Sequence, residues 1–289
     1  MKPIAKQSNN KTAFTIVELL TVMSIIIILM GLLAPAMNRV RNFARKVSQK
    51  NQFHSIDVAL ELFRSEFDGY PDSGRLDVSG ASYCGAMKLA EAMVGQDLLG
   101  YHPDSRFLAD GSDGLATPTQ LYIPATLKAR KEHYLPLEQA NAYRLNDIYS
   151  SFGPYTFPNR FVLCDVYTRV MNINTGKRIG MPILYYTANT SRTAHDLVNP
   201  NNNQNIYDYT DNHELGVLGK PWDPPPPAGT GAPHTLVSDP TQFYKSTWNE
   251  KVSTVSTLNR PYRVDSYILL SAGFDGEYGT PDDIFNFGE

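Results

Sequence analysis

Residues 14–36 read FTIVELLTVMSIIIILMGLLAPA, an almost wholly apolar stretch. Glu18 is its only charged residue. About 20 apolar residues are enough for an α-helix to cross the hydrocarbon core of a bilayer, so the stretch predicts a membrane-spanning helix. A carboxylate inside hydrocarbon costs roughly 2.5 to 3.5 kcal/mol even on lenient insertion scales. We therefore expect Glu18 to have a function that offsets this cost.

The residues in front of the apolar stretch lack the pattern of a secretory signal peptide. Residues 1–13 read MKPIAKQSNNKTA and are basic and polar, without an acid. A secretory signal has a shorter apolar region, roughly 7 to 15 residues, followed by a small-residue cleavage site. Here the apolar region is longer, and no A-x-A-like site follows it. An ordinary signal anchor, in which Glu18 has no function, is the alternative to a specialised anchor.

The residues around position 14 resemble a known processing signature. In the type IV pilins and the type II secretion pseudopilins, a short basic leader is cut just before a Phe, and a Glu is the fifth residue of the mature chain. Counted from Phe14, Glu18 is fifth and Pro35 is twenty-second, where this family commonly has a proline. The residue before the cut is usually Gly in the family and is Ala13 here. Leader, Phe, Glu and Pro in this phase are together more specific than any short motif.

The resemblance implies a processing step and an assembly mechanism. A dedicated prepilin peptidase would cut between Ala13 and Phe14 and N-methylate Phe14, so that residues 1–13 are a cleaved leader. The Phe14 ammonium of one subunit would then neutralise Glu18 of a neighbour inside the apolar bundle and set the stagger between subunits. The implied partners are further copies of the chain, minor pseudopilins and an inner-membrane assembly platform.

The resemblance also implies a location. The chain would cross the inner membrane once, with its N-terminus in the cytoplasm and its head in the periplasm, and the filament would lie in the periplasm or at the cell surface. The positive-inside rule alone gives the opposite orientation, because five bases between residues 39 and 50 outnumber the three lysines of the leader. We give the resemblance precedence and expect these bases to meet anionic headgroups or the acids of a neighbouring subunit.

Apolar residues continue at helical spacing beyond the membrane stretch. Two sets point to opposite sides of the helix, Val40, Phe43, Ala44 and Val47 first, and then Phe53, Ile56, Leu60, Phe63 and Phe67. We therefore predict one helix over 14–67, on the order of 80 Å long, whose residues 37–67 continue into the head. The first set would pack against other subunits and the second against the chain's own head. The alternative is a break within the polar residues 48–52.

Residues 68–289 predict a globular head of the α+β class. Asp68-Gly69-Tyr70-Pro71 ends the long helix and resembles the corresponding family element. Residue patterns predict helices over 86–99 and 137–149 and strands over 161–170, 179–187 and 266–272, which would form an antiparallel sheet on the helix. The resemblance covers roughly 14–72 and 262–285, so the middle, 72–260, is a large insertion of loops and helices.

The charge of the head argues against nucleic acid as a partner. Residues 51–289 contain 18 of the 26 bases and 28 of the 29 acids, a net charge of −10. A domain that follows a phosphate backbone has the opposite charge.

A second informative stretch lies near the C-terminus, at residues 271–285. Four carboxylates, Asp275, Glu277, Asp282 and Asp283, occur there among glycines and a proline. They repel one another unless a cation lies among them, and oxygen ligands on a loop suit Ca²⁺. The stretch resembles the calcium loop of the major type II secretion pseudopilin, whose ligands match Asp275 and Asp283. Glu277 and Asp282 are further candidates, and a solvated acidic turn is the alternative.

The remaining residues give no sign of an enzyme. Six histidines are scattered without metal-ligand spacing and outside any nucleophile motif. Cys84 and Cys164 are too few for a disulfide scaffold, and they are either two buried thiols or, if the head lies outside the cytoplasm, one disulfide.

The sequence therefore predicts a structural subunit of a type II secretion pseudopilus, which assembles through its N-terminal helix into a filament that drives protein secretion. A type IV pilus subunit is the alternative within the family. A membrane-anchored, calcium-dependent binding module that does not polymerise is the alternative from another class.

Overall fold

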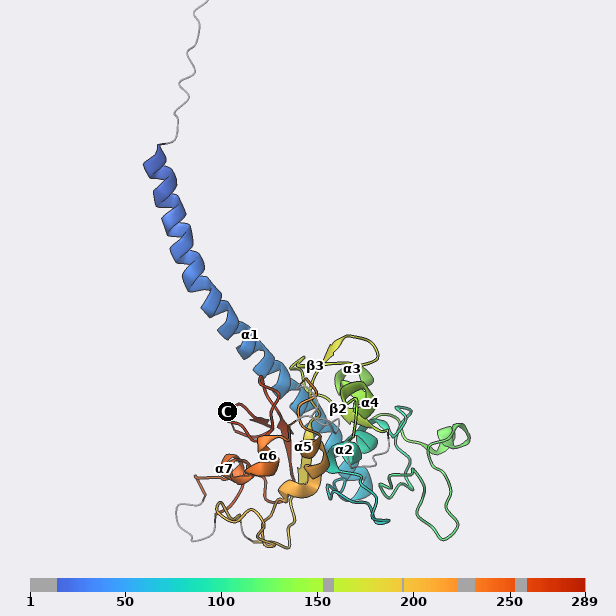
Figure 1. The fold of residues 1–289 in the computed structure, drawn as a ribbon. Helices are drawn as coiled ribbons and strands as arrows, with labels where there is room; N and C mark the ends of the chain where they lie inside the picture. Colours follow the sequence, from blue (N-terminus) through green and yellow to red (C-terminus); the bar gives the residue numbers. More distant parts are fainter. Residues whose placement is uncertain (1–14, 153–158, 194, 223–231, 253–258, 289) are drawn as a thin grey trace, which may run out of the picture. The chain divides into compact units, whose positions relative to one another are not determined.

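The computed structural model describes residues 15–152, 159–193, 195–222, 232–252 and 259–288. The chain divides into two compact units, Met1–Ala44 (unit 1) and Arg45–Glu289 (unit 2). Helix α1 (Ile16–Phe67) continues from one unit into the other without interruption (Figure 1). A break within residues 48–52, the alternative that the sequence left open, is therefore wrong. The predicted leader, with Ala13 and Phe14, lies outside the described residues.

In unit 1, α1 exposes its apolar side chains. Every large apolar residue from Ile16 to Leu33 is between 45% and 77% exposed. Among the residues described, α1 is also the one helix that is long and apolar enough to cross a membrane. Soluble monomers rarely expose a contiguous apolar patch larger than a few hundred Å². Lipid or another polypeptide must therefore cover this surface.

In unit 2, α1 buries one stripe of side chains. Phe53, Ile56, Leu60 and Phe63 are at most 3% exposed. The earlier apolar set remains exposed, at Val40, Phe43 and Val47. The predicted change of face along the helix is thus confirmed for the second set, and the first set is left without a partner in the part of the chain that the structure describes.

The polar residues between the two sets attach α1 to unit 2. Gln49 and Gln52 are buried, although the sequence reads as polar all round at this point. The Gln52 side-chain amide donates a hydrogen bond to the Cys164 carbonyl at 2.9 Å, and the Val166 N–H donates to Gln49 Oε1 at 2.9 Å. These two bonds hold the helix against segment 164–166, although Gln49 Nε2 and Gln52 Oε1 are buried without a partner among the described residues.

The main sheet is antiparallel, in the order β5 (Leu184–Thr187), β6 (Tyr267–Ser271), β7 (Ile284–Phe285). Two smaller antiparallel pairs are β1 (Ala142–Arg144) with β2 (Phe161–Leu163), and β3 (Val170–Met171) with β4 (Arg178–Ile179). Helices and small antiparallel sheets in one unit agree with the predicted α+β class.

Both faces of the main sheet are buried. Tyr185, Tyr267 and Leu269 belong to the cluster that contains the α1 stripe. Their neighbours Tyr186, Ile268 and Leu270 belong to a second cluster. Successive side chains of a strand point to opposite faces, so the sheet lies between two cores. This arrangement explains why β6 reads as an uninterrupted run of buried residues.

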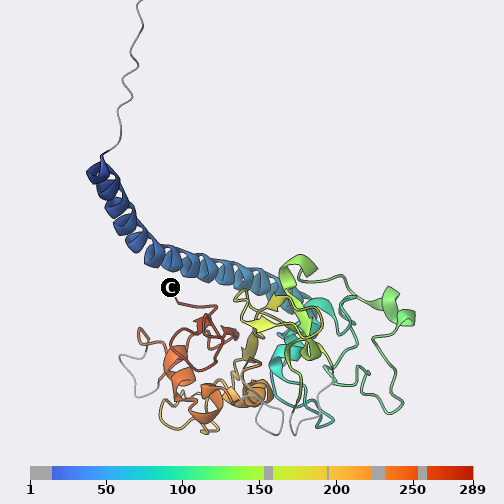
Figure 2. The same ribbon diagram turned by 45° about the horizontal axis from the view of Figure 1, so that its top comes forward.

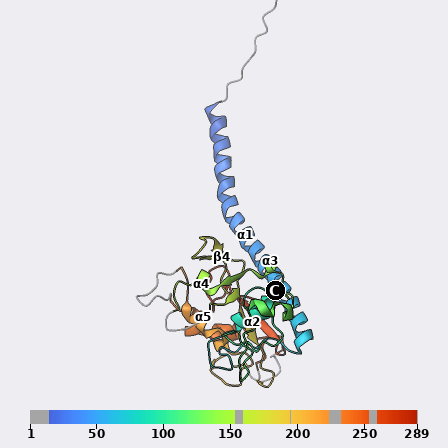
Figure 3. The ribbon, with the colours of Figure 1, turned by 90° about the vertical axis from the view of Figure 1, so that its right-hand side faces the viewer.

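Short helices surround this centre. Helix α2 (Gly85–Val94) is buried along its whole length. The others are η1 (Pro124–Ala129), α3 (Leu137–Ala140), α4 (Leu145–Ile148), η2 (Tyr209–Asn212), α5 (His213–Leu218), α6 (Thr235–Ser238) and α7 (Thr241–Thr247). Two views place α6 and α7 and the η1 region at opposite ends of unit 2 (Figures 1 and 2). The C-terminal segment returns to α1, where Lys50 Nζ donates to the Gly288 carbonyl at 3.0 Å (Figure 3).

Several predicted elements differ from the structure. The helix predicted over 86–99 ends at Val94, followed by Gly95 with a φ of 82°. The helix predicted over 137–149 is wrong, because Asn141 adopts a left-handed conformation and its amide donates to the carbonyls of Cys164 and Asp165. Strand β1 therefore separates α3 from α4. The strands predicted over 161–170 and 179–187 form only at their ends, whereas the strand over 266–272 is confirmed.

A buried carboxylate connects the segment after β2 to the main sheet. Asp165 is 1% exposed. Its Oδ1 accepts the N–H groups of Tyr167 and Met181, each at 3.1 Å, and its Oδ2 accepts the Ser271 hydroxyl at 2.8 Å. In the part of the chain that the structure describes, no base forms an ion pair with it. Burial raises the pKa of Asp165 to about 7.

The protein should therefore lose stability as the pH rises through about 7. A folded-state pKa above the unfolded value means that the protonated carboxyl favours folding, fully at low pH, and that ionisation removes this contribution at about 1.4 kcal/mol per pKa unit. Asp165→Asn keeps the oxygen that accepts both N–H groups and cannot ionise. Its melting temperature should exceed that of the wild type at pH 8.5, measured on the full chain in detergent.

Burial raises the pKa of Asp211 to about 7 as well, so the Asp165→Asn variant should keep part of the pH dependence. Asp104→Asn is the matched control, since the Asp104 side chain is 78% exposed. A pH dependence of the melting temperature that is the same in Asp165→Asn and the wild type would contradict the assignment to Asp165.

Candidate functional site

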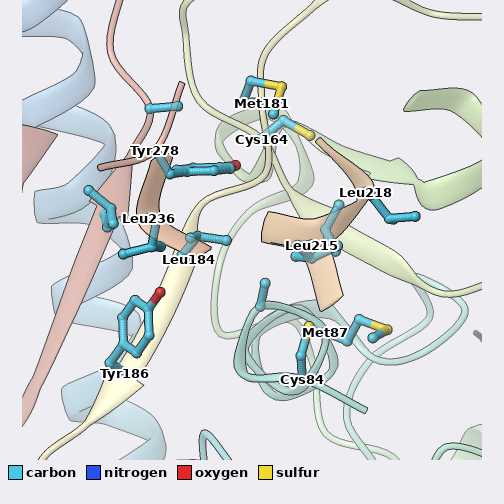
Figure 4. Packing of buried hydrophobic residues seen from close by; sticks show 14 of the residues in the cluster. Cys84, Met87, Cys164, Met181, Leu184, Tyr186, Leu215, Leu218, Leu236 and Tyr278 are labelled. Carbon is cyan, nitrogen blue, oxygen red and sulfur yellow. The ribbon is translucent and has the colours of Figure 1, made fainter. Parts of the chain in front are cut away.

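The candidate metal site is the acidic loop, residues 272–283, which joins the adjacent strands β6 and β7. Gly273 has a φ of 64°, and a Cβ there would lie 2.3 Å from the Asp282 carbonyl oxygen. Only glycine therefore allows the two ends of the loop to approach so closely. The ring of Tyr278 is buried in the core between Leu236 and Cys164 (Figure 4). The loop is thus anchored by its own side chain as well as by the strands.

Asp275 and Asp282 lie side by side in this loop. The Asp275 N–H donates to Asp282 Oδ2 at 3.0 Å, and Thr280 Oγ1 lies 3.1 Å from Asp275 Oδ2 and 2.6 Å from Asp282 Oδ1. Burial and the neighbouring Asp282 raise the pKa of Asp275. Burial acts on Asp282 in the same direction, but hydrogen bonds from Thr280 and the Asp275 N–H outweigh it and lower its pKa. The two carboxyls therefore lose their protons in separate steps.

Asp283 is the carboxylate of the loop with the fewest hydrogen bonds for its burial. Its Oδ2 accepts the Gly279 N–H at 2.9 Å, but its Oδ1 is buried without a hydrogen-bond partner among the described residues. Burial raises the pKa of Asp283 well above its usual range, and the charges of Asp282 and Asp275 add to this effect. An unpartnered, buried carboxylate oxygen is expensive unless a proton or a cation satisfies it.

Glu277 has a different role from the three aspartates. Its Oε2 forms an ion pair with Lys220 Nζ at 2.8 Å, and its Oε1 accepts the Thr235 hydroxyl at 2.6 Å. Burial raises the pKa of Glu277, but the hydrogen bonds from Lys220 and Thr235 outweigh this and lower it. Both carboxylate oxygens are therefore already engaged in holding the loop to segment 220–235.

The donor chemistry of the loop fits a hard cation. Asp275, Asp282 and Asp283 supply carboxylate oxygens close together in sequence and space, and Ca²⁺ favours such ligands together with backbone carbonyls. Within the described ranges, however, no three His, Cys, Asp or Glu side chains already enclose a metal position. A bound ion would therefore need the aspartate side chains to rotate from their present hydrogen bonds.

Glu18 has a local partner in unit 1. Thr15 precedes the helix, and its N–H and hydroxyl donate to Glu18 Oε2 at 2.8 and 2.9 Å, while the Glu18 N–H donates back to Thr15 Oγ1 at 3.2 Å. This reciprocal arrangement is a capping box, which satisfies donors at the start of α1. The spacing T-x-x-E could have revealed it in the sequence. Pro35, the other residue of the signature, lies within α1.

The two cysteines are free thiols in the structure, and both are buried. Figure 4 shows Cys84 next to Met87 and Cys164 next to Met181, with Leu184 and Leu215 between them. The disulfide that the sequence left open is therefore not formed, because the core separates the two side chains. Burial raises the pKa of Cys84 to about 12 and that of Cys164 well above its usual value. Neither thiol is a nucleophile at neutral pH.

The buried polar cluster around Glu91 was not predicted from the sequence. Glu91 of α2 is 1% exposed and accepts hydrogen bonds from Tyr83, Gln96, Ser105 and Tyr122. These donors fasten the segment after α2 to the helix. A lone acid in the small, apolar helix GAMKLAEAMV was the available signal, because such a residue must be satisfied internally.

The buried histidines have structural contacts. His195 Nε2 lies 2.8 Å from the Tyr244 carbonyl, and His234 Nδ1 accepts the Tyr278 N–H at 3.2 Å. Burial lowers the pKa of each to about 4, so both are neutral at physiological pH.

Comparison with known proteins gives no relative: no family model, curated protein or solved structure matches this chain.

Proposed function

We propose that this chain is a filament subunit of the type II secretion pseudopilus class, with Glu18 and the Phe14 amine as the pair that sets the assembly register. Prepilin peptidase, minor pseudopilins and an inner-membrane platform are its proposed partners. Before assembly, residues 14–36 anchor the chain in the inner membrane, and the head, 68–289, lies in the periplasm.

The observation that carries the proposal is the exposed apolar surface of α1 with one carboxylate near its start. Lipid acyl chains can cover Ile16 to Leu33, but they supply no positive charge for Glu18, which would otherwise have to take up a proton. The capping box satisfies only the hydrogen bonds of Glu18 and leaves its charge. An ammonium from a neighbouring subunit supplies both charge and register, which a lone membrane anchor does not need.

The exposed second surface of α1 supports the same proposal. Val40, Phe43 and Val47 are 43% to 69% exposed, and they lie beyond the stretch that a bilayer would cover. In a bundle of parallel copies, such a stripe packs against neighbouring helices. The stripe at Phe53 to Phe63, by contrast, is already occupied within unit 2.

Processing is the most direct test. The mature chain should begin at Phe14, lose the three leader lysines and gain an N-methyl group. Intact mass and N-terminal sequencing of membrane-extracted protein measure this outcome. A chain that retains Met1 or Lys2 would overturn the proposal.

A second prediction separates the charge of Glu18 from its capping role. Glu18→Gln keeps a side-chain acceptor for the capping box but removes the charge, so it should insert in the membrane and fail to form filaments. Thr15→Ala removes the cap, at a cost of about 1 kcal/mol, but keeps the charge, so it should assemble. The measurement is cross-linking of the double variant Leu20→Cys/Leu29→Cys with a bifunctional thiol reagent, because two thiols on opposite sides of the helix let each subunit join two neighbours and give ladders of oligomers in a filament.

The native thiols should not interfere, because both are buried. Ladders of equal intensity in Glu18→Gln and the wild type would show that the register does not depend on the charge. Ladders absent from every variant, with correct membrane insertion, would favour the binding module that does not polymerise.

A third prediction concerns Ca²⁺ in the acidic loop, with Asp275, Asp282 and Asp283 as ligands. Calcium at 100 times its dissociation constant should stabilise the full chain by about 2.7 kcal/mol, or roughly 5 to 10 °C in melting temperature. Magnesium and chelator should give no such shift. Asp275→Asn and Asp283→Asn should each remove most of the shift.

Glu277→Gln is the matched control within the same loop. It should lower the melting temperature with and without calcium, because it breaks the pair with Lys220, but it should retain the calcium shift. Equal melting temperatures in calcium and chelator for the wild type would leave the loop as a solvated acidic turn.

A further inference from the structure

Unit 2 contains a hollow of about 290 Å³ that is lined by three arginines. Arg45 comes from α1, Arg169 from the residue before β3, and Arg178 from β4. Thr168 and the rings of Tyr167 and Phe274 complete the lining. Three exposed arginines from segments that are far apart in the sequence thus line one hollow.

The hollow is basic in an acidic part of the chain. None of its lining residues is an acid, although residues 51–289 carry a net charge of −10. Across the described ranges, none of the three arginines forms an ion pair with an acid. Arg169 instead lies over the Trp222 ring, 4.9 Å from its centre. Neighbouring guanidinium groups repel each other, so an anion between them would lower the energy of the site.

The geometry of the ligand groups favours phosphate. A guanidinium presents its N–H donors as a planar fork that matches the oxygens of a phosphate, and several forks around one hollow can bind one phosphate group together. A carboxylate has only two oxygens and one negative charge. Three arginines therefore suit a phosphate better than the side chain of an acidic residue from another copy.

The rest of the lining and its neighbourhood favour a lipid as the source of the phosphate. Phe274 is 51% exposed at the hollow, and aromatic rings beside bases are typical of the boundary between membrane and water. Arg45 follows the predicted membrane stretch by nine residues, and residues 37–56 contain five bases and no acid. Such a segment is attracted to anionic lipids by about 1 kcal/mol for each base near the surface.

We propose that Arg45, Arg169 and Arg178 bind the phosphate group of an anionic phospholipid, with Phe274 against the apolar part of the same lipid. The site holds unit 2 at the membrane surface. The proposal rests on the proposed function only in placing this chain at a membrane, and it does not require a filament.

The test uses the full chain, purified in a non-ionic detergent with chelator present, so that the acidic loop plays no part. Native mass spectrometry measures its binding of phosphatidylglycerol and of phosphatidylcholine with the same acyl chains. The wild type should bind phosphatidylglycerol more tightly by at least about tenfold, because the loss of charge-assisted hydrogen bonds costs that much or more. The double variant Arg169→Gln/Arg178→Gln should lose most of this preference and keep only the weaker attraction of the bases in residues 37–56 to anionic lipid.

Two variants control for indirect effects. Arg106→Gln changes an exposed arginine outside the hollow and should bind phosphatidylglycerol as the wild type does. Arg169→Lys/Arg178→Lys keeps the charge but loses the fork, so its preference should lie between those of the wild type and the Gln variant. Unchanged melting temperatures would show that the variants fold.

Other outcomes would overturn the proposal. These are equal binding of the two lipids by the wild type, a preference that the Gln variant retains in full, and complete competition by inorganic phosphate at the concentration of the lipid, which would indicate a free phosphate as ligand. Competition by a peptide with the sequence of residues 271–285 but not by phosphate would identify another copy of the chain as the occupant. A chain that prefers phosphatidylglycerol but forms no filament would leave this inference intact and remove the proposed function.

Discussion

The packing of the α1 stripe against the main sheet is the interaction on which unit 2 depends. The α1 stripe and most of the apolar residues of α2 lie on one face of β5, β6 and β7, while Ala86 and Met87 of α2 and residues between β5 and β6 lie on the other. A sheet of three short strands is marginal by itself and becomes stable only when its faces are buried. The α1 stripe therefore forms part of the core on one face of the sheet. The same helix must also present apolar residues elsewhere, which is why its stripe changes face at the polar residues near Gln49 and Gln52.

The charged groups in unit 2 are placed where they hold separate segments together. Asp165 joins the segment after β2 to β6, Glu91 holds the loop after α2, and Glu277 binds Lys220. Each accepts hydrogen bonds on both carboxylate oxygens, although at Asp165 burial outweighs these bonds and raises the pKa. Asp283 is different, because one of its oxygens has no donor in the part of the chain that the structure describes. Since the acidic loop connects two adjacent strands, its state of protonation acts directly on the edge of the sheet.

Three surfaces remain for partners, and their chemistry differs. The stretch from Ile16 to Leu33 is apolar and carries a single charge, which suits a bundle of helices in lipid. The stripe at Val40, Phe43 and Val47 is apolar but narrower, which suits helix packing outside the bilayer. The arginine hollow is positive and lined in part by the exposed Phe274, which suits a lipid headgroup. The three surfaces consist of different residues, so the proposed bundle, packing stripe and headgroup site do not compete with one another.

The elements with a regular spacing of apolar residues could be predicted from the sequence alone. Helical spacing predicted the long helix, the stripe at Phe53 to Phe63 and its change of face, and the apolar run at 266–272 predicted β6. The crowding of acids also marked Asp275, Glu277, Asp282 and Asp283 as members of one acidic loop. Four other features are visible only in the folded structure. Asn141 breaks a predicted helix, and Cys84 and Cys164 lie apart. Glu277 is held by Lys220, and Arg45, Arg169 and Arg178 line one hollow. These four features depend on contacts between segments that are distant in the sequence. Periodicity shows which face of an element is apolar, but hydrogen bonds and charges from distant segments decide what packs against that face.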